Sequence, residues 1–109
     1  MKKKFHFSSN LIPLVLSGKK NITWRLWDDK DLSEGDTVDF LESGTEKRFA
    51  TAELIKVIEK PMGELTDEDK KGHEDFKSDE EMYQTYKKYY QRKVTPKTVV
   101  KIIRFKLIP

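Results

Sequence analysis

The segment at residues 18–25, with the sequence GKKNITWR, places a hydroxyl among three positive charges. We expect it to run from a turn into a strand, where Thr23 and Arg25 leave the same face because alternate side chains share a face. Lys20 lies in or beside the turn and can reach that face from there. A hydroxyl framed by fixed positive charge suits either binding a phosphate or activating an oxygen nucleophile. The segment is therefore a candidate either for a phosphate-binding site or for a catalytic site with an oxygen nucleophile.

A threonine nucleophile needs a base and a proton carrier beside it. A lysine such as Lys20 can act as the base only where burial or nearby cations lower its pKa, and Lys19 and Arg25 are suitable cations. Glu74 is the candidate carboxylate, because it lies in the predicted connection between two helices, where site residues are often found. The alternative is that a threonine beside a lysine simply forms an ordinary strand surface.

Alternation of apolar and polar residues, bounded by turn residues, predicts the strands that must position this segment. The fourth strand is long and its alternation changes, so we expect it to bend or change partner before Pro61 ends it. Residues 43–45 predict a hairpin connection. The predicted strands span residues 4–7, 21–27, 37–41, 48–58 and 98–107.

Three short helices are predicted from their capping residues. Pro13 is tolerated in the first turn of the first helix. Strands at both ends, with two helices inserted before the last strand, indicate an α+β fold built on a small and largely closed mixed β-barrel. The helices are expected between Asn10 and Gly18, over residues 67–71 after Thr66, and from a capping box at Ser78 to about Arg92.

The length of 109 residues predicts a single domain over residues 1–109. The chain has no run of 18 apolar residues and no apolar leader, so we expect neither a membrane span nor a signal peptide, and we predict a cytoplasmic location. Cysteine is absent, and the two histidines lack metal-site spacing, so no metal or other cofactor is expected. Plentiful Lys and Glu, with two Asn and two Gln, resemble proteins from hot environments.

The charge is distributed unevenly along the chain, although the net charge is +3. Residues 64–81 hold nine acids and three lysines, whereas residues 87–106 hold eight bases and no acid. The first thirty residues add seven bases against two acids. If the two ends of the chain meet in the fold, they form a basic face suited to a polyanion such as RNA.

The aromatic residues near this segment have two interpretations each. Trp24 has the opposite parity to Thr23 and is predicted to lie in the core. Trp27 shares the parity of Thr23 and either stacks on a nucleic-acid base or caps the barrel. The tyrosines at residues 83–90 recur at helical spacing and are predicted to pack, while one flank of them remains a candidate part of the basic face.

Four segments together resemble the ASCH domain: residues 18–25, the run Gly35-Asp36-Thr37-Val38, residues 72–74, and the late strand at 100–105. ASCH domains belong to the PUA-like superfamily of small β-barrels, which commonly bind RNA. The resemblance spans nearly the whole chain and preserves the order of its elements, although the motif G-[KR]-K-x-[IV]-T-x-R is short.

The resemblance also extends to small bacterial members of this family, which are amidohydrolases that deacetylate 4-acetylcytidine with a Lys, a Thr and a Glu. By position in the motif, it implies that Lys20 is the base, Thr23 the nucleophile and Glu74 the proton carrier. The chain departs from these members at Trp24, at Trp27 and in the longer segment 78–93.

The expected function is therefore binding of RNA or a modified nucleoside in a basic cleft, with Lys19, Arg25 and Trp27 as contact residues. The alternative is deacetylation of 4-acetylcytidine. The sequence predicts no oligomeric state.

Overall fold

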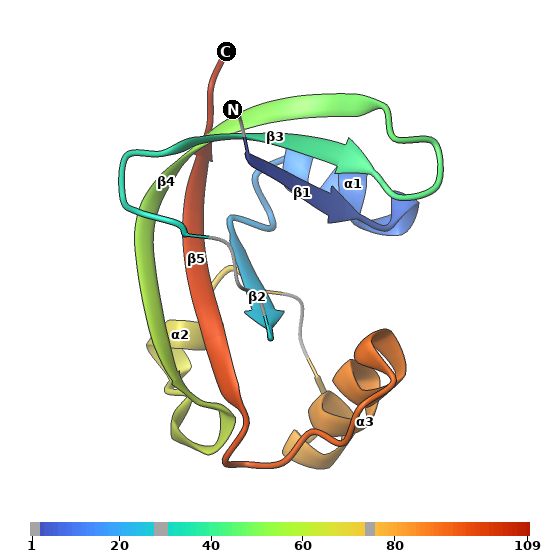
Figure 1. Ribbon diagram of the computed structural model, residues 1–109, viewed down its shortest axis with the longest axis vertical. Coiled ribbons are helices and arrows are strands. Elements are labelled where there is room, and N and C mark those ends of the chain that lie inside the picture. Colours follow the sequence, from blue (N-terminus) through green and yellow to red (C-terminus); the bar gives the residue numbers. More distant parts are fainter. Residues whose placement is uncertain (1–2, 28–30, 74–75) are drawn as a thin grey trace.

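Five strands form one curved mixed sheet in the order β1-β3-β4-β5-β2 (Figure 1). The computed structural model describes residues 3–27, 31–73 and 76–109. Strands β1 and β3 are parallel, and the other neighbouring pairs are antiparallel. The strands are β1 (Lys3–Phe7), β2 (Ile22–Leu26), β3 (Thr37–Glu42), β4 (Arg48–Pro61) and β5 (Val99–Leu107).

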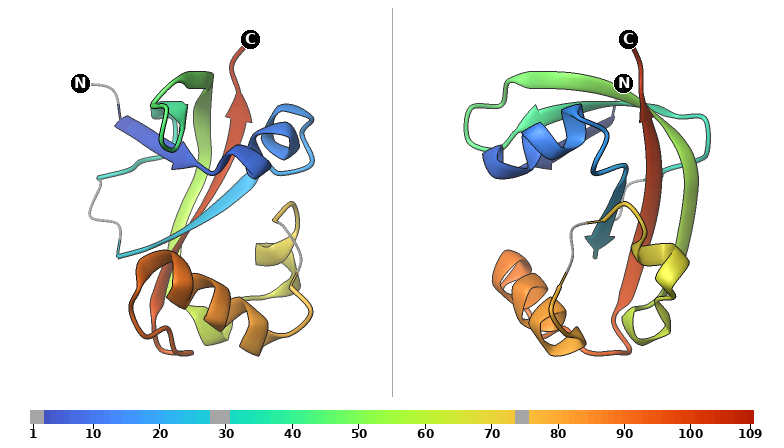
Figure 2. Two further views of the ribbon diagram at one scale, coloured as in Figure 1. Left: turned by 90° about the vertical axis from the view of Figure 1, so that its right-hand side faces the viewer. Right: turned by 180° about the vertical axis from the view of Figure 1, so that it is seen from behind.

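Three α-helices accompany the sheet, with α1 near β1 at one end of the molecule and α3 at the other end (Figure 2). Strand β2 lies between these two ends. None of the helices in the described ranges is long and apolar enough to cross a membrane. The helices are α1 (Ile12–Leu16), α2 (Asp67–Lys70) and α3 (Asp79–Tyr90), with 3-10 turns at Ser9–Leu11 and Met62–Glu64.

The predicted N-cap at Asn10 is wrong. Asn10 lies inside the 3-10 turn, and Leu11 precedes the first residue of α1 without a side-chain cap. The backbone N–H of Ile12 donates to the carbonyl of Ser9, and Pro13 has no N–H. The first turn of α1 therefore offers Asn10 no donor to accept from.

The start of α3 agrees with the sequence. The side chain of Ser78 accepts a hydrogen bond from the backbone N–H of Glu81 at 3.1 Å. A reciprocal capping box is present at α2 instead, where Thr66 and Asp69 each accept from the other's backbone N–H. The end of α3 is set by Gln91, which adopts a left-handed conformation.

Strand β4 bends as the change in its alternation predicted. Its register against β5 shifts between Leu54 and Lys56, so the two halves of β4 face different parts of the molecule. Two apolar clusters result. One fills the curved sheet with Phe5, Phe7, Val38, Phe40 and Phe105, and the other packs Ile22, Trp24, Leu26 and Met62 against Met82 of α3.

The predicted small mixed barrel is confirmed as a half-barrel, which is more open than the largely closed barrel expected, because β1 and β2 are the two edges of the sheet. Arg25 on β2 spans this opening. Its two terminal nitrogens each donate a hydrogen bond to the carbonyl of His6 on β1 at 3.2 Å. Its guanidinium lies 4.8 Å from the ring centre of Phe5 and 4.9 Å from that of Phe7. One side chain thus ties the two edge strands together.

We expect Arg25→Lys to lower the free energy of unfolding by about 1–2 kcal/mol, since an ammonium cannot replace a forked donor pair stacked on rings. Urea denaturation measures this loss. Arg48→Lys is the matched control, because Arg48 is exposed and lies 3.8 Å from Asp39 in a surface ion pair. Equal stability of the two variants would contradict a bridging role for Arg25.

Asp69 anchors α2 to β4. Its carboxylate accepts from Lys60 Nζ at 2.6 Å, from the Thr66 N–H at 2.8 Å and from the Thr66 hydroxyl at 3.0 Å. Burial alone would raise the pKa of Asp69, but these hydrogen bonds outweigh burial and hold the pKa below its ordinary value. The folded state therefore favours the carboxylate form.

Because the folded pKa is lowered, the stabilising effect of Asp69 is present above the unfolded pKa and is lost as the pH falls through the folded one. We expect Asp69→Asn to be less stable than the wild type by about 1–3 kcal/mol at pH 7, with the gap closing below about pH 4. Urea denaturation at pH 7, 5 and 3 checks this, and Asp67→Asn on the same helix is the control. A gap that stayed constant with pH would refute the assignment.

Candidate functional site

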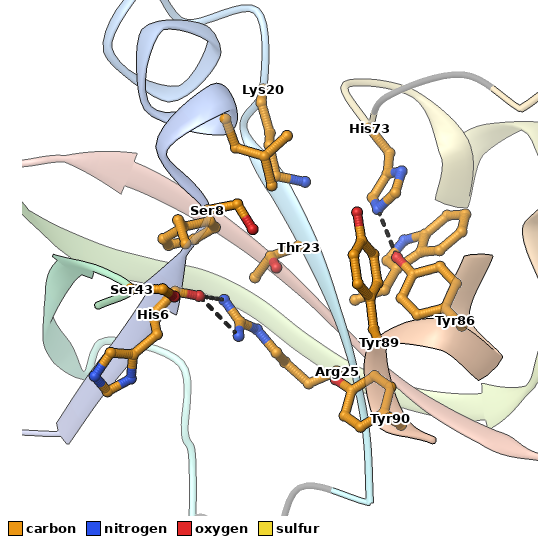
Figure 3. Close-up of a pocket in the computed structure, with 13 residues that line it drawn as sticks. His6, Ser8, Lys20, Thr23, Arg25, Ser43, His73, Tyr86, Tyr89 and Tyr90 are labelled. Carbon is orange, nitrogen blue, oxygen red and sulfur yellow. Dashed lines mark hydrogen bonds between the residues drawn. The ribbon is translucent and has the colours of Figure 1, made fainter. Parts of the chain in front are cut away.

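Lys20, Thr23 and Arg25 line one cavity of about 270 Å³ (Figure 3). One wall of the cavity carries these cations and hydroxyls, and aromatic rings form the opposite wall. Lys20, which was expected to reach the face of Thr23 from the turn, lines the same cavity as Thr23. Among the described residues that line it, none is acidic. This lining therefore favours an anionic or electron-rich ligand.

Lys20 is held beside Thr23 by the end of α1. Gly18 turns the chain with a φ of 82°, and the backbone N–H of Lys20 then donates to the carbonyl of Leu14 at 3.0 Å. The side chain of Lys20 is 3% exposed, and its Nζ donates to the carbonyl of Ile22 at 2.9 Å. The ammonium nitrogen is thus fixed next to the residue that precedes Thr23.

The segment at residues 72–73 closes over the same end of β2. The backbone N–H of Asn21 donates to the carbonyl of Gly72 at 3.2 Å. A Cβ on Gly72 would lie 2.0 Å from the side-chain oxygen of Asn21, and Gly72 has a φ of 87°. The positive φ favours glycine at this position, and a side chain here would also have to displace the amide of Asn21.

Thr23 and Arg25 leave β2 toward the cavity, as their shared parity predicted. The side chain of Thr23 is 4% exposed. Arg25 reaches the cavity while donating to His6, so the cavity wall and the tie between the edge strands share one guanidinium. Ser8 and Ser43 add hydroxyls at the rim on this side.

The aromatic wall is built around Trp24. Its ring stacks on the ring of His73 with centroids 3.8 Å apart and planes inclined by 16°. His73 Nε2 lies 3.1 Å from the hydroxyl of Tyr86, within hydrogen-bonding distance. Trp24, His73 and Tyr86 are each more than 90% buried. Tyr89 and Tyr90 continue the wall toward solvent, with Tyr89 62% exposed.

Two of the predicted site residues, Lys19 and Trp27, do not line this cavity. Glu74 lies outside the described residues, so its placement stays a prediction. Lys19 is exposed and is absent from the lining. Trp27 follows the end of β2 with a φ of 51°, is 41% exposed, and has the guanidinium of Arg92 4.0 Å from its ring centre. The binding roles of Lys19 and Trp27 also stay predictions.

Sequence reasoning missed His73 and Tyr86 as cavity residues, and it treated Trp24 as core alone. Trp24 is in the core, as predicted, but it also lines the cavity. Because β2 is an edge strand, side chains from both of its faces reach a cavity beside that edge. The Gly72-His73 segment within the family resemblance was the one available signal for His73.

The expectation of a basic region formed by both ends of the chain has a structural counterpart. Strand β2 pairs with β5, and Arg25 lies opposite Lys101.

No group of three or more His, Cys, Asp or Glu side chains suited to a metal ion occurs in the described part of the chain.

No protein-family model and no curated protein matches this sequence. Solved structures do match its fold. Protein EF3133 from Enterococcus faecalis, of the DUF984 family, is 22% identical with a TM-score of 0.80, and the match covers 99% of this chain and 80% of that one. The hypothetical protein PH0355 is 23% identical with a TM-score of 0.74, over 99% of this chain and 100% of that one.

An ASCH domain from Lactobacillus crispatus matches with a TM-score of 0.72. It is 13% identical, and the match covers 96% of this chain and 78% of that chain. At these identities the likeness concerns the fold, and it agrees with the resemblance seen in the GKKNITWR segment. The chain therefore has the fold of an ASCH-like domain.

Proposed function

We propose that the cavity binds a nucleoside, either free or as one residue of an RNA strand. The observation that carries this proposal is the facing pair of walls, one with Lys20, Thr23 and Arg25 and the other with Trp24, His73 and Tyr86. A base offers a flat π-face for the aromatic wall and carbonyl oxygens for the cationic wall. The two walls thus match the two kinds of surface on a nucleoside.

The size of the cavity supports a small ligand. Its 270 Å³ lies just below the range of about 300–1,000 Å³ that is usual for small-molecule sites. One nucleoside suits this space, and a second base would have to lie outside it. Specificity among bases would come from the Lys20 amine, which the carbonyl of Ile22 holds in place, and from the buried Thr23 hydroxyl.

Quenching of tryptophan fluorescence tests this proposal, because Trp24 forms part of the wall. Cytidine and 4-acetylcytidine are titrated into the wild type and into Lys20→Met. We expect saturable quenching in the wild type and a loss of affinity of about tenfold or more in Lys20→Met, since a buried charged donor is removed. Lys56→Met is the control, because Lys56 is exposed on β4 and lies outside the cavity lining. No saturable binding of any nucleoside by the wild type would end the proposal.

A second candidate is hydrolysis of the acetyl amide of 4-acetylcytidine, supported by the family resemblance and by the presence of Lys20 and Thr23 in one cavity. Thr23 Oγ would attack the acetyl carbon while its proton passes to Lys20, which must be a neutral amine for this step. The C–N bond would break as the cytosine amine receives a proton through Glu74, leaving an acetyl-threonine. Water would then cleave this ester to acetate and restore the hydroxyl.

Loss of 4-acetylcytidine absorbance, with cytidine and acetate as products, tests the second candidate. No turnover at high protein concentration, together with saturable binding, would leave the binding function alone.

A further inference from the structure

A second groove adjoins the nucleoside cavity and shares one of its walls. It has a volume of about 390 Å³ and lies at the end of β2, where β5 begins. Arg25 lines both hollows. Tyr90 lines the first one and contacts Trp27, which lines the second, with ring centroids 5.6 Å apart. The two hollows are therefore neighbours on one continuous surface.

The boundary between the two hollows is fixed in place. Arg25 is held by its two hydrogen bonds to the carbonyl of His6. Tyr90 is held by the backbone N–H of Leu26, which donates to its hydroxyl at 3.1 Å. A ligand that extends from the first hollow must pass this guanidinium, which is a strong donor to phosphate oxygens.

The second groove is mainly cationic. Arg25, Lys97 and Lys101 line it against one carboxylate, that of Glu59, which lies 3.8 Å from Lys101 Nζ. Trp27 adds an aromatic ring that remains 41% exposed with the guanidinium of Arg92 stacked 4.0 Å from its centre. Cations beside an exposed aromatic ring are the pattern that binds single-stranded nucleic acid.

We infer that the ligand is a single-stranded oligonucleotide, of which one nucleoside enters the first cavity and the adjoining nucleotide occupies the second groove. This inference rests on the proposed function. The connecting phosphodiester lies at Arg25, the neighbouring base stacks at the Trp27 and Arg92 pair, and Lys97 neutralises the next phosphate. A paired base cannot enter the first cavity, so a duplex is excluded.

The experiment compares cytidine, cytidine 5′-monophosphate and a trinucleotide with a central cytidine, in ribose and deoxyribose forms, by titration calorimetry at fixed ionic strength. We expect the trinucleotide to bind at least about tenfold more tightly than cytidine. Trp27→Ala should weaken trinucleotide binding by about 5- to 100-fold, from the usual contribution of stacking, and change cytidine binding less than twofold. Trp27→Phe should restore most of the affinity.

Lys97→Met should weaken trinucleotide binding and reduce its salt dependence by about one phosphate contact, again without effect on cytidine. Lys56→Met, on exposed β4, is the control for loss of a positive charge and should behave as the wild type. If cytidine 5′-monophosphate binds as tightly as the trinucleotide, one phosphate accounts for all of the added affinity, and the inference is overturned.

The outcomes separate this inference from the proposed function. Equal affinity for cytidine and the trinucleotide, or equal affinity for a longer single strand that contains the trinucleotide and for the duplex of that strand, overturns the inference while the nucleoside cavity stands. Equal losses in Lys97→Met and Lys56→Met also overturn it, because the attraction is then unspecific. Failure of the wild type to bind cytidine and the trinucleotide alike removes the proposed function and the inference together.

Discussion

Thr23→Val is expected to lower turnover of 4-acetylcytidine by at least about 100-fold while changing the affinity for the nucleoside less than tenfold. Valine keeps the shape and burial of Thr23, which is 4% exposed, and removes the oxygen that would attack the acetyl carbon. A missing nucleophile acts on the chemical step, whereas Lys20 and Arg25, which we propose to bind the base, remain in place. Absorbance assays give the rate, and tryptophan quenching gives the affinity.

Thr23→Ser is the matched control, because it retains a hydroxyl at the same position and should keep measurable turnover. Turnover in Thr23→Val at the wild-type rate would refute a threonine nucleophile. A loss of affinity as large as the loss of rate would show that the hydroxyl acts in binding, which is the first proposed function.

The second large effect is expected from Trp24→Ala, which should cost about 3–5 kcal/mol of stability, as is usual for deleting a buried large aromatic side chain. Trp24 is 3% exposed and stacks on His73, with Phe76 and Tyr86 within 6.5 Å and 6.1 Å between ring centroids. Its removal would leave a hole where β2 meets α3. Thermal and urea denaturation measure the loss.

Trp27→Ala is the internal control, since Trp27 is 41% exposed and should cost about 1 kcal/mol or less. Trp24→Phe should lie between the two and stay folded, so that its affinity for nucleosides can be measured. Equal destabilisation by Trp24→Ala and Trp27→Ala would show that Trp24 does not hold α3 against β2.

Local patterns predicted most of the elements because each depends on neighbours in sequence. The alternation along 48–58 predicted the start and the bend of β4, although the strand continues to Pro61, and Ser78 marked the start of α3 correctly. The Asn10 cap failed because a cap depends on which backbone donors remain, and the 3-10 turn at Ser9–Leu11 had already engaged the N–H of Ile12. Residue types alone do not show which acceptor a given backbone N–H will bond to.

The residues of the site likewise fall into two groups: those that local sequence predicted and those that only the tertiary structure brought to the cavity. The sequence pointed to Lys20, Thr23 and Arg25, since their parity and turn depend on eight consecutive residues. His73 and Tyr86 come from distant segments and reach the cavity because β2 is an edge strand that packs against α3. Trp24 belongs to both groups. Its parity along β2 predicted that it lies in the core, and its position on an edge strand also makes it part of the cavity wall.

Residues close in sequence determined one thing about this protein by themselves: an amine and an alcohol that face the same way. Whether a ligand could enter between them was decided by long-range packing, which set an aromatic wall opposite and left the sheet open at its edge. That hollow exists because the two outer strands are joined by a guanidinium instead of a backbone ladder. Closing them with a continuous ladder would leave the amine and alcohol with no space to act in.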